Sequence, residues 1–504
     1  MRKMVEQNIT SALVFEDDTD WDIRIHSQMQ DFARASRILL QPLPGTSDQM
    51  LDPTYPEPGE AQGARDFDIT REVTAEPTTS PYGDIDRWDI FWLGHCGARF
   101  PAADDKNTPL GRAVILDDVT VPEKQHIDEH LGPGKGSSPL HLTKATLIPG
   151  GDGNIDNIKN VTLGFQKIFA INLPLRTDHR DQMSLAAHFT GMQVDYVDGV
   201  SEVDTRTLPP GGDPKAHIGV LGSWRAHLNV MRKMVEQNIT SALIFEDDTD
   251  WDIRIHSQMQ DFARASRLLL QPLPGTSDQM LDPTYPEPGE AQGARDFDIT
   301  REVTAEPTTS PYGDIDRWDI FWLGHCGARF PAAGDKNTPL GRAVILDDVT
   351  VPEKQHIDEQ YGDKQLIQQY PDHTRVVTRA HDNVCTLAYA ISLPGARRVL
   401  YELGMHKMNA AYDIMLKEMC DGRNGRRIRT CLSVQPMLFQ HHRPIAAKSS
   451  FSDIGKREIE YTGMAFTRNI RWSTRVNLPK LIDGDTNYTD LFRDGEPRPE
   501  LVYT

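Results

Sequence analysis

The stretch Leu243-Ile-Phe-Glu-Asp-Asp-Thr-Asp250 passes directly from apolar strand formers into a group of four carboxylates. Residues 241–245 form a short apolar run of the kind that makes a buried strand, so the acidic residues follow its carboxyl end. Upstream, two strand-like runs alternate with two segments of helical apolar spacing. These predicted elements are strands 168–173 and 193–197 and helices 178–190 and 222–238. Such alternation is typical of an α/β fold with a mostly parallel sheet flanked by helices.

The predicted domain continues downstream and covers residues 163–475. Its further predicted elements are strands 318–324 and 387–392 and a helix over 394–403. Residues 273–316 form a long, acidic, proline-rich insertion with no clear period, and loops of this length are usually disordered or cover a site. The polar tail 476–504 is expected to be peripheral.

Part of this domain occurs twice in the chain. Residues 1–129 repeat residues 231–359, and three positions differ, namely Val14 against Ile244, Ile38 against Leu268 and Asp104 against Gly334. Identity this high indicates a recent duplication or an error in the assembly of the coding sequence. The function is therefore inferred from the second copy, which lies inside a complete domain.

The first copy begins at an unfavourable place. Met1 corresponds to a methionine inside the predicted helix 222–238, so residues 12–15 lack the strands and the helix that would pack beside them. A parallel strand without neighbours leaves backbone groups and apolar faces uncovered. We therefore expect residues 1–129 to be a non-catalytic partial duplicate that folds poorly alone and is dispensable for activity. The Gly- and Pro-rich segment 130–162 is expected to be a linker.

The composition limits the classes of protein that fit. Without the duplicate, about 375 residues remain, which suits one large or two modest domains. The hydrophobic fraction of 38 % and the mean hydropathy of −0.51 are low but exclude wholesale disorder. A formal net charge of −20 disfavours binding to nucleic acid or to anionic lipid. The sequence has no run of 18 apolar residues, so no transmembrane segment is expected.

Cysteines and sequons bear on the compartment. Cys96 is the copy of Cys326, and Cys420 with Cys431 could close a short loop in an oxidising compartment. Triplets for N-glycosylation occur at Asn160, Asn238 and Asn487 and favour the ER or Golgi lumen. The first seven residues lack a signal-peptide pattern, which favours the cytoplasm instead. Both locations stay open.

The acidic stretch is the strongest candidate for chemistry. Adjacent carboxylates repel each other unless a cation or solvent separates them, and Mg²⁺ and Mn²⁺ prefer such oxygen ligands. Asp247, Asp248 and Asp250 are therefore the candidate metal ligands, with His442 as a later ligand. His441 and His442 are neighbours whose side chains point in different directions, so at most one is expected to serve. The alternative is an acidic turn that caps the next helix.

Two other segments carry candidate residues. Asn172-Leu-Pro-Leu-Arg-Thr-Asp-His-Arg180 leaves the first strand and enters a helix, with guanidinium groups suited to phosphate and a possible capping aspartate. The alternative is a solvated loop. Asp413 starts an apolar helical stretch as either a helix N-terminal charge or a catalytic carboxylate. Trp224 and Trp322 are expected to be core residues, and the histidines near them to be structural.

In order, these segments resemble glycosyltransferase family 25. The resemblance covers residues 163–455 and is carried by Ile171-Asn-Leu-Pro-Leu-Arg-Thr-Asp-His-Arg, Gly219-Val-Leu-Gly-Ser-Trp-Arg-Ala-His, Leu243-Ile-Phe-Glu-Asp-Asp, Ala388-Tyr-Ala-Ile-Ser with Gly395-Ala, Asp413 and Val434-Gln-Pro. It implies a GT-A-like nucleotide-diphospho-sugar transferase fold, a UDP-sugar donor, a divalent cation (Mn²⁺ or Mg²⁺) and inversion at the anomeric carbon.

The resulting hypothesis is a metal-dependent glycosyltransferase that moves a sugar from a UDP-sugar to a hydroxyl of a glycan or glycoprotein, with inversion implied by the resemblance. Galactose is the leading candidate for the sugar. Asp413 is the predicted base, and the predicted nucleotide-sugar contacts are Asn172, Arg176, Asp178, Arg180 and Glu246. The alternatives are a catalytically inactive nucleotide-sugar or carbohydrate-binding protein and a metal-dependent phosphohydrolase.

Overall fold

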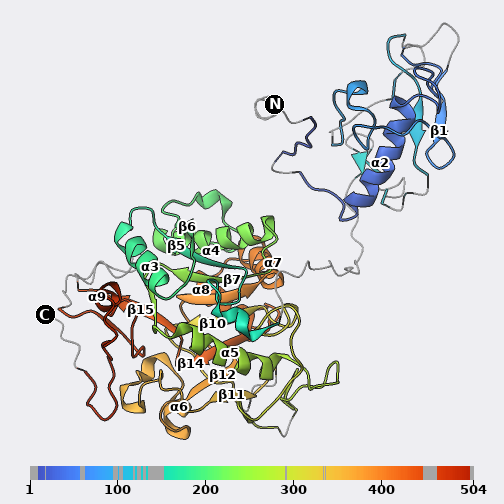
Figure 1. The fold of residues 1–504 in the computed structure, drawn as a ribbon. Helices are drawn as coiled ribbons and strands as arrows, with labels where there is room; N and C mark the ends of the chain where they lie inside the picture. Colours follow the sequence, from blue (N-terminus) through green and yellow to red (C-terminus); the bar gives the residue numbers. More distant parts are fainter. Residues whose placement is uncertain are drawn as a thin grey trace. The chain divides into compact units, whose positions relative to one another are not determined.

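The computed structural model divides the chain into two compact units, Met1–Lys144 (unit 1) and Ala145–Thr504 (unit 2) (Figure 1). It describes residues 10–16, 19–56, 63–94, 100–101, 106–116, 118, 120–121, 127–128, 132–133, 153–289, 292–332, 334, 337–445 and 463–499. The boundary between the units falls inside the segment predicted to be a linker. Within the described residues, no helix combines the length and the apolar character needed to cross a bilayer.

Unit 2 is built on one mixed sheet with the strand order β6-β5-β7-β13-β10-β14-β12-β11-β9. The bounds are β5 Lys167–Asn172, β6 Asp195–Asp198, β7 Ser241–Glu246, β9 Asp296–Asp298, β10 Ile320–Gly324, β11 Arg342–Ile345, β12 Arg375–Arg379, β13 Ala388–Ser392 and β14 Cys431–Gln435. Off this path, β15 (Phe439–Arg443) pairs with β10, with β8 (Thr249–Trp251) and with β16 (Phe466–Thr467).

The strand directions create a crevice at one edge of the sheet. Strand β5 lies between β6 and β7 and is parallel to both. The next strand in the chain, β6, is added on one side of β5, and the following strand, β7, is added on its other side. In open α/β sheets, ligands bind at the carboxyl ends of strands where the strand order reverses in this way. Strand β13 then runs antiparallel to both β7 and β10. The predicted α/β architecture is confirmed, with antiparallel pairs joined to the parallel part.

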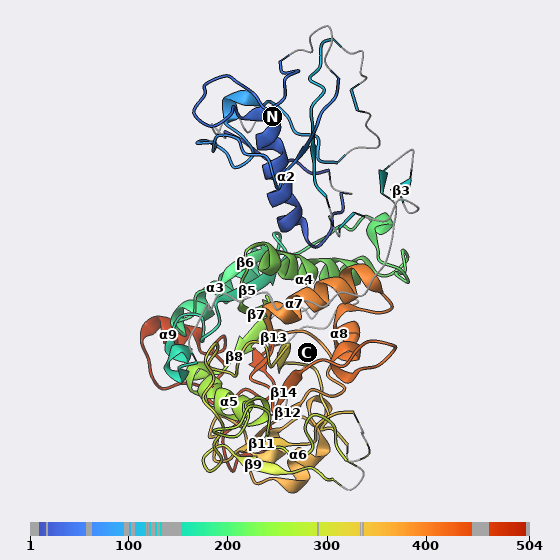
Figure 2. The ribbon, with the colours of Figure 1, turned by 90° about the vertical axis from the view of Figure 1, so that its right-hand side faces the viewer.

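Helices cover both faces of this sheet (Figure 2). Their bounds are α3 Thr177–Phe189, α4 Ile218–Glu236, α5 Ile255–Leu270, α6 Lys364–Gln369, α7 Leu393–Tyr401, α8 Tyr412–Asp421 and α9 Leu478–Asp483. Strand β7 shows why two layers form, because alternate side chains of a strand face opposite sides. Leu243 and Phe245 join a core with α3 and α5, whereas Ala242 and Ile244 join a second core with α4, α7 and α8. Trp224 and Trp322 are buried in the second core, as predicted.

The insertion 273–316 contains β9, and its final part is packed against the core. Tyr312 is fully buried and stacks on Phe165 with ring centroids 4.6 Å apart. The guanidinium group of Arg267 on α5 donates to the carbonyl oxygen of Pro311 at 2.8 Å. These aromatic and polar contacts attach the end of the insertion to the core, so the prediction of a disordered or covering loop is wrong for this part.

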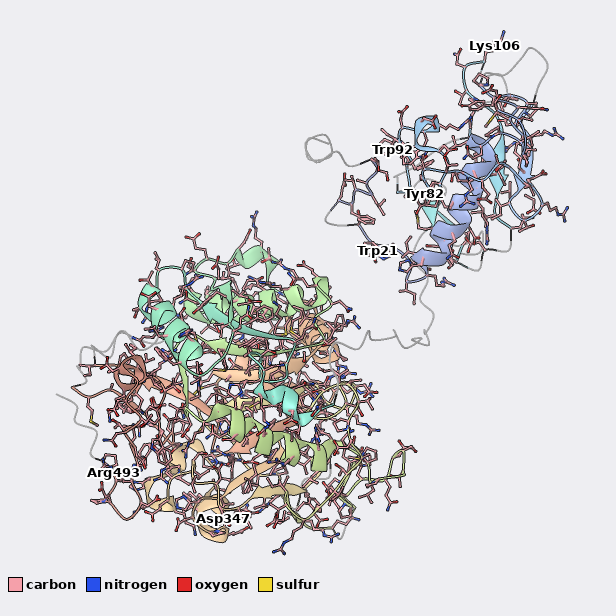
Figure 3. All side chains as sticks on the ribbon, viewed as in Figure 1. Trp21, Tyr82, Trp92, Lys106, Asp347 and Arg493 are labelled. Carbon is pink, nitrogen blue, oxygen red and sulfur yellow. A yellow bond between two sulfur atoms is a disulfide. The ribbon has the colours of Figure 1, made fainter. Side chains whose placement is uncertain are left out.

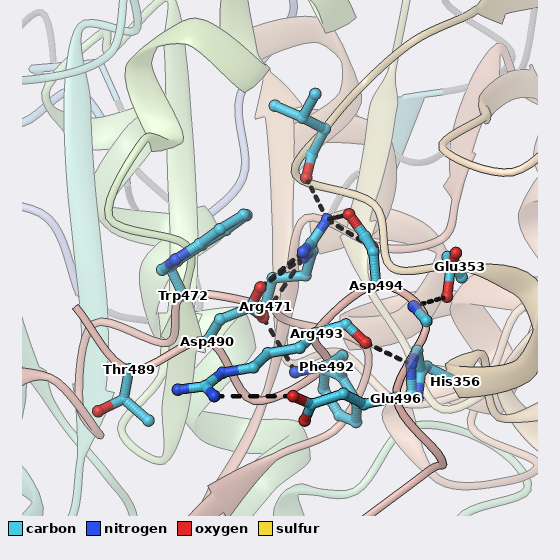
Figure 4. A network of polar contacts seen from close by, with 12 residues as sticks. Glu353, His356, Arg471, Trp472, Thr489, Asp490, Phe492, Arg493, Asp494 and Glu496 are labelled. Atoms are coloured by element: carbon cyan, nitrogen blue, oxygen red, sulfur yellow. Dashed lines mark hydrogen bonds and ion pairs between the residues drawn. The ribbon is translucent and has the colours of Figure 1, made fainter. Parts of the chain in front are cut away.

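The polar tail is likewise fixed to unit 2 by charged and polar contacts, drawn in Figure 4. Arg471 forms ion pairs with Asp490 at 2.6 Å and with Asp494 at 3.0 Å. The ring of His356 makes a hydrogen bond of 3.1 Å with the carbonyl oxygen of Arg493. The tail therefore lies on the surface, as predicted, but is held in one place by these contacts.

Two disulfides lie on the side of the second core. Cys420–Cys431 joins α8 to β14, and the sequence had left this pairing open. Cys326–Cys385 joins the segment after β10 to the segment before β13, and this pair was not predicted. Cys96, the copy of Cys326, lies outside the described residues.

Unit 1 contains α2 (Ile25–Leu40), the parallel pair β1 (Asp66–Asp68) and β2 (Arg112–Val114), and the short pair β3 (Ile127–Asp128) and β4 (Gly132–Pro133). A small core of Ala35, Ile38, Phe67 and Ile69 joins α2 to β1. The described residues 11–15, which repeat β7, form no strand here.

Candidate functional site

The site begins where β7 ends. Five consecutive residues of β7 are buried between the two helix layers, which fixes its last residue, Glu246, at the edge of the sheet. Asp247 and Asp248 form the turn that follows, and Asp250 lies within β8. The acidic stretch therefore lies at the crevice beside β5 that the strand order creates.

Glu246, Asp248 and His441 form one group in which the potential ligand atoms all lie within 4.8 Å of one another. The Nε2 atom of His441 on β15 is 3.7 Å from Oδ2 of Asp248. Burial lowers the pKa of His441, which favours the neutral imidazole that binds metals. Burial alone would raise the pKa of Asp248, but the nearby guanidinium groups of Arg443 and Arg475 help to lower it below its ordinary value. Two carboxylates and a neutral imidazole are a donor set that could hold a divalent cation.

Asp250 and His442, which were also predicted as metal ligands, lie outside this group. Asp250 is fully buried and accepts hydrogen bonds from Thr467 Oγ1 at 2.6 Å, from the Ser473 hydroxyl and from the Arg475 backbone N–H at 3.1 Å. The Nδ1 atom of His442 lies 3.7 Å from the same carboxylate. Adjacent residues of a strand face opposite sides, so His441 faces Asp248 while His442 faces Asp250.

Asp247 connects the acidic turn to β5 and α3. Its Oδ2 atom accepts a hydrogen bond of 2.8 Å from the Asn172 side chain, and its Oδ1 atom lies 2.8 Å from Nδ1 of His179. Asn172 also donates to the carbonyl oxygen of Arg176, while its own side-chain oxygen is buried without a partner. These contacts leave Asp247 outside the group of three and make it a link between neighbouring strand ends.

A cavity of about 250 Å³ adjoins this turn. Its walls come from the ends of β5 and β7, the segment after β6 and the first half of α4, which are the elements around the crevice. The lining residues are Ile171, Leu173, His179, Gly199, Val200, Ser201, Ile218, Gly219, Gly222, Ser223, Ala226, His227, Glu246, Asp247 and Asp248. Acidic residues thus close one end, and small and apolar residues form the rest.

Gly222 shapes this cavity by allowing α4 to approach the segment after β6. A Cβ atom at Gly222 would lie 2.1 Å from the carbonyl oxygen of Val200. No side chain fits at that distance, so a larger residue would push the helix outward. The sequence contains Gly222 within the motif Gly219-Val-Leu-Gly, but this packing role was not predicted.

Neither of the predicted phosphate-binding arginines lines the cavity. Arg176 pairs with Asp178 at 3.0 and 2.9 Å, and this hydrogen bonding lowers the pKa of Asp178 to about 2. Arg180 lies over the ring of Tyr196 at 4.2 Å. His179, between them in sequence, lines the cavity instead, because it points from the first turn of α3 toward Asp247.

A buried polar network supports Glu246 from behind. Its Oε1 atom accepts a hydrogen bond of 2.9 Å from Thr386 and lies 3.4 Å from Nε2 of His227. The other ring nitrogen of His227 contacts the Tyr389 hydroxyl at 3.0 Å, and its ring stacks on Tyr412 at 4.4 Å. The structural role predicted for this histidine agrees with these contacts, but its contact with Glu246 was not predicted.

Asp413 is in the first turn of α8 and is half-buried. Its Oδ2 atom accepts a hydrogen bond of 2.9 Å from the backbone N–H of Cys385. Thr386, the next residue, contacts Glu246, so two consecutive residues connect Asp413 to the group of Glu246, Asp248 and His441. Asp413 itself does not line the cavity.

Comparison with known proteins gives partial matches. No family model matches the chain. A stretch of 138 residues is 29 % identical to procollagen galactosyltransferase 1-A of Xenopus laevis and covers 24 % of this chain and 21 % of that protein. A second stretch, of 104 residues, is 33 % identical to a glycosyltransferase 25 family member of Drosophila pseudoobscura pseudoobscura. It covers 18 % of this chain and 17 % of that protein. A third stretch, of 113 residues, is 26 % identical to procollagen galactosyltransferase 1 of Danio rerio. It covers 20 % of this chain and 19 % of that protein.

The chain thus spans about a fifth of the length of the curated relatives that it matches. Two of these relatives carry galactosyltransferase names and the other carries the family name itself, which the motifs of this sequence also indicate. The resemblance predicted from those motifs is confirmed: over this part of its length, the chain is similar to members of glycosyltransferase family 25.

Proposed function

We propose that unit 2 is a metal-dependent glycosyltransferase that moves a sugar from a UDP-sugar to a hydroxyl of a glycan or glycoprotein with inversion. Galactose is the leading candidate for this sugar. The observation that carries the proposal is the group of Glu246, Asp248 and His441 beside a cavity of about 250 Å³ at the strand ends. The names of the relatives add the reaction class. A GT-A-like fold is part of the same proposal, supported by the parallel strands that end at the acidic turn.

Glu246, Asp248 and His441 are the residues proposed to hold Mn²⁺ or Mg²⁺. A bound divalent cation would stabilise the negative charge that develops on the diphosphate leaving group. Thr386 and His227 fix the carboxylate of Glu246, while Asp248 stays ionised near Arg443. The chain itself thus presents two oriented carboxylates before any ligand binds.

The remaining roles follow from position. Asp247, held by Asn172 and His179, borders the cavity and is proposed to orient the donor. Three of the predicted nucleotide-sugar contacts, Arg176, Asp178 and Arg180, lie outside the cavity lining. They are proposed to contact the donor at the rim of the cavity. Asp413 is proposed as the base that accepts the proton of the acceptor hydroxyl, since the Cys385 N–H holds one carboxylate oxygen and so orients the group.

The test replaces one carboxylate and uses the repeated segment as its control. Glu246→Gln in the full chain is expected to lower Mn²⁺-dependent UDP release from UDP-galactose about 100-fold or more, because a ligand to the cation is lost. Glu16→Gln changes the identical position of unit 1 and is expected to leave the rate unchanged. Equal rates for Glu246→Gln and the unaltered chain would overturn the proposal.

A panel of glycan and glycoprotein acceptors separates transfer from hydrolysis. Transfer predicts that one acceptor raises UDP release and gains one sugar in mass. Calorimetric binding of UDP-galactose without any turnover in Mn²⁺ would instead indicate an inactive nucleotide-sugar-binding protein. Release of UMP and galactose 1-phosphate without modification of any acceptor would indicate a phosphohydrolase.

A further inference from the structure

The same sequences occupy opposite environments in the two units. Val14 is 75 % exposed and Trp92 is 79 % exposed in unit 1, while their copies Ile244 and Trp322 are fully buried in unit 2. Other apolar side chains of unit 1 behave in the same way. The exposed ones with fully buried copies include Leu13, Phe15, Ile90 and Leu93. Trp21 and Trp92 are labelled among the side chains of unit 1 in Figure 3.

These side chains come from residues 11–15 and 90–94, here called the strand-copy segments. In unit 2 their counterparts belong to β7 and β10, which pair on either side of β13. Residues 388–392 occur once in the chain and form β13 there, so unit 1 has no such strand. Among the described residues of unit 1, the pairs are β1 with β2 and β3 with β4, and neither strand-copy segment takes part.

We propose that the strand-copy segments form a self-association surface and that its partner is the same surface on a second copy of this chain. The complementary strand β13 is not available, because it is fully buried inside the sheet of unit 2. Unit 1 of another copy presents the same exposed apolar segments, so it offers a surface of matching composition. Contiguous apolar segments with unpaired backbone groups are templates for strand pairing.

The composition of the segments supports pairing between identical copies. Residues 11–15 are Ser-Ala-Leu-Val-Phe and residues 90–94 are Ile-Phe-Trp-Leu-Gly, so neither contains a charge or a proline. Charged residues and proline are the usual means by which exposed edges resist pairing. Two copies can therefore meet at these segments without like charges facing each other. The net charge of −20 opposes association at longer range, so added salt should strengthen it.

The test is the oligomeric state of the full chain, measured by size-exclusion chromatography with light scattering over a range of concentrations. We expect oligomers above the monomer mass of 56.7 kDa that increase with concentration and with salt. The double variant Val14→Lys/Trp92→Lys is expected to be monomeric. A chain that is monomeric throughout, as docking of unit 1 within its own molecule would give, overturns the proposal.

The control adds the same two charges elsewhere on unit 1. Val73 and Leu116 are exposed, and their copies Val303 and Leu346 are also exposed, so these positions are not buried strand positions in either unit. Val73→Lys/Leu116→Lys is therefore expected to associate as the unaltered chain does. If this control also abolishes association, or if Val14→Lys/Trp92→Lys retains it, the strand-copy segments are not the interface.

Discussion

Two adjacent histidines of β15 contact different carboxylates. His441 approaches Asp248 in the proposed metal group, whereas His442 approaches Asp250 in a buried network with Thr467. The two positions are therefore proposed to have different physical roles, one in metal binding and one in holding β8 to β16. Replacement of each histidine should separate these roles.

His441→Ala is expected to raise the Mn²⁺ concentration needed for half-maximal UDP release about 10- to 100-fold, with little change in stability. His442→Ala is expected to lower the free energy of unfolding by about 1–3 kcal/mol, because a buried partner of Asp250 is lost. Manganese titrations and urea unfolding measure the two effects. The same loss of stability in both variants would contradict the separate roles.

Gly222 provides a second test at the residue scale. Gly222→Ala places a Cβ atom against the Val200 carbonyl oxygen, so α4 must shift at an expected cost of about 1–3 kcal/mol and with weaker UDP binding. Gly293→Ala is the matched control, since a Cβ there meets no atom within 4 Å. Thermal unfolding and calorimetry with UDP measure both quantities. Unchanged UDP affinity in Gly222→Ala would show that α4 does not shape the donor site.

At this scale the sequence predicts residue types better than their orientations. The acidic stretch and the need for a late histidine were predicted, and Asp248 is in the observed group. His441 rather than the predicted His442 lies in this group, because the pairing of β15 with β8 places His441 opposite Thr249. Nothing in the local sequence specifies which residues of two strands far apart in the chain face each other.

At the scale of elements, the segment between β12 and β13 connects the proposed catalytic parts. It contains Cys385, whose N–H holds Asp413, and Thr386, whose hydroxyl holds Glu246. The disulfide Cys326–Cys385 attaches this segment to the end of β10. The second disulfide, Cys420–Cys431, contacts neither group directly.

Removal of each disulfide is therefore expected to have different consequences. The chain-entropy relation gives about 4 kcal/mol for the Cys326–Cys385 loop and about 3 kcal/mol for the shorter Cys420–Cys431 loop. Paired Cys→Ser substitutions should lower stability in both cases, but only Cys326→Ser/Cys385→Ser should also lower the activity of the folded protein. Urea unfolding and UDP release under folding conditions measure this. Equal activity in the two double variants would show that the segment holds its place without the bond.

The elements with apolar runs were predicted well, and those with buried charges were missed. Predicted strands 241–245 and 387–392 agree closely with β7 and β13. Strand β12 was missed because Arg375 and Arg379 interrupt its apolar pattern. Arg375 is nevertheless buried, since Asp348 pairs with it at 2.9 Å and backbone carbonyl oxygens accept its other protons. Such compensation comes from distant parts of the chain and leaves no local signal.

At the scale of the whole molecule, one buried histidine couples folding to pH. His325 follows β10, is fully buried and contacts the Val434 carbonyl oxygen at 3.0 Å. Burial lowers its pKa from 6.5 to about 4. Between pH 6.5 and pH 4 the unfolded chain therefore binds more protons at His325 than the folded chain does. The contribution of His325 to the stability of unit 2 is lost as the pH falls through this range.

We expect the contribution of His325 to lower the free energy of unfolding by about 3 kcal/mol between pH 7.5 and pH 4. His325→Gln should remove this part of the pH dependence, and His188→Gln, at an exposed position of α3, should keep it. Urea unfolding at several pH values measures the difference. Identical pH profiles for His325→Gln and the unaltered chain would contradict a buried neutral imidazole.

The two copies also show how much of a strand is decided by its surroundings. Residues 241–246 form a central strand because β5 and β13 supply hydrogen bonds on both sides. Residues 11–15, nearly identical in sequence, are exposed and pair with none of the described strands. The exposure of the first copy was predictable from the missing neighbours.

The partners of Asp250 have a consequence for biosynthesis. β8 emerges from the ribosome with a carboxylate whose hydrogen-bond donors, Thr467 and Ser473, are translated more than 200 residues later. Until those residues arrive, the carboxylate has none of these donors, and a buried charge without partners is strongly unfavourable. The acidic turn therefore reaches its final geometry only after residues 467–473 have been translated, so a nascent chain stopped before residue 467 contains the whole acidic stretch but not the contacts that hold it in place.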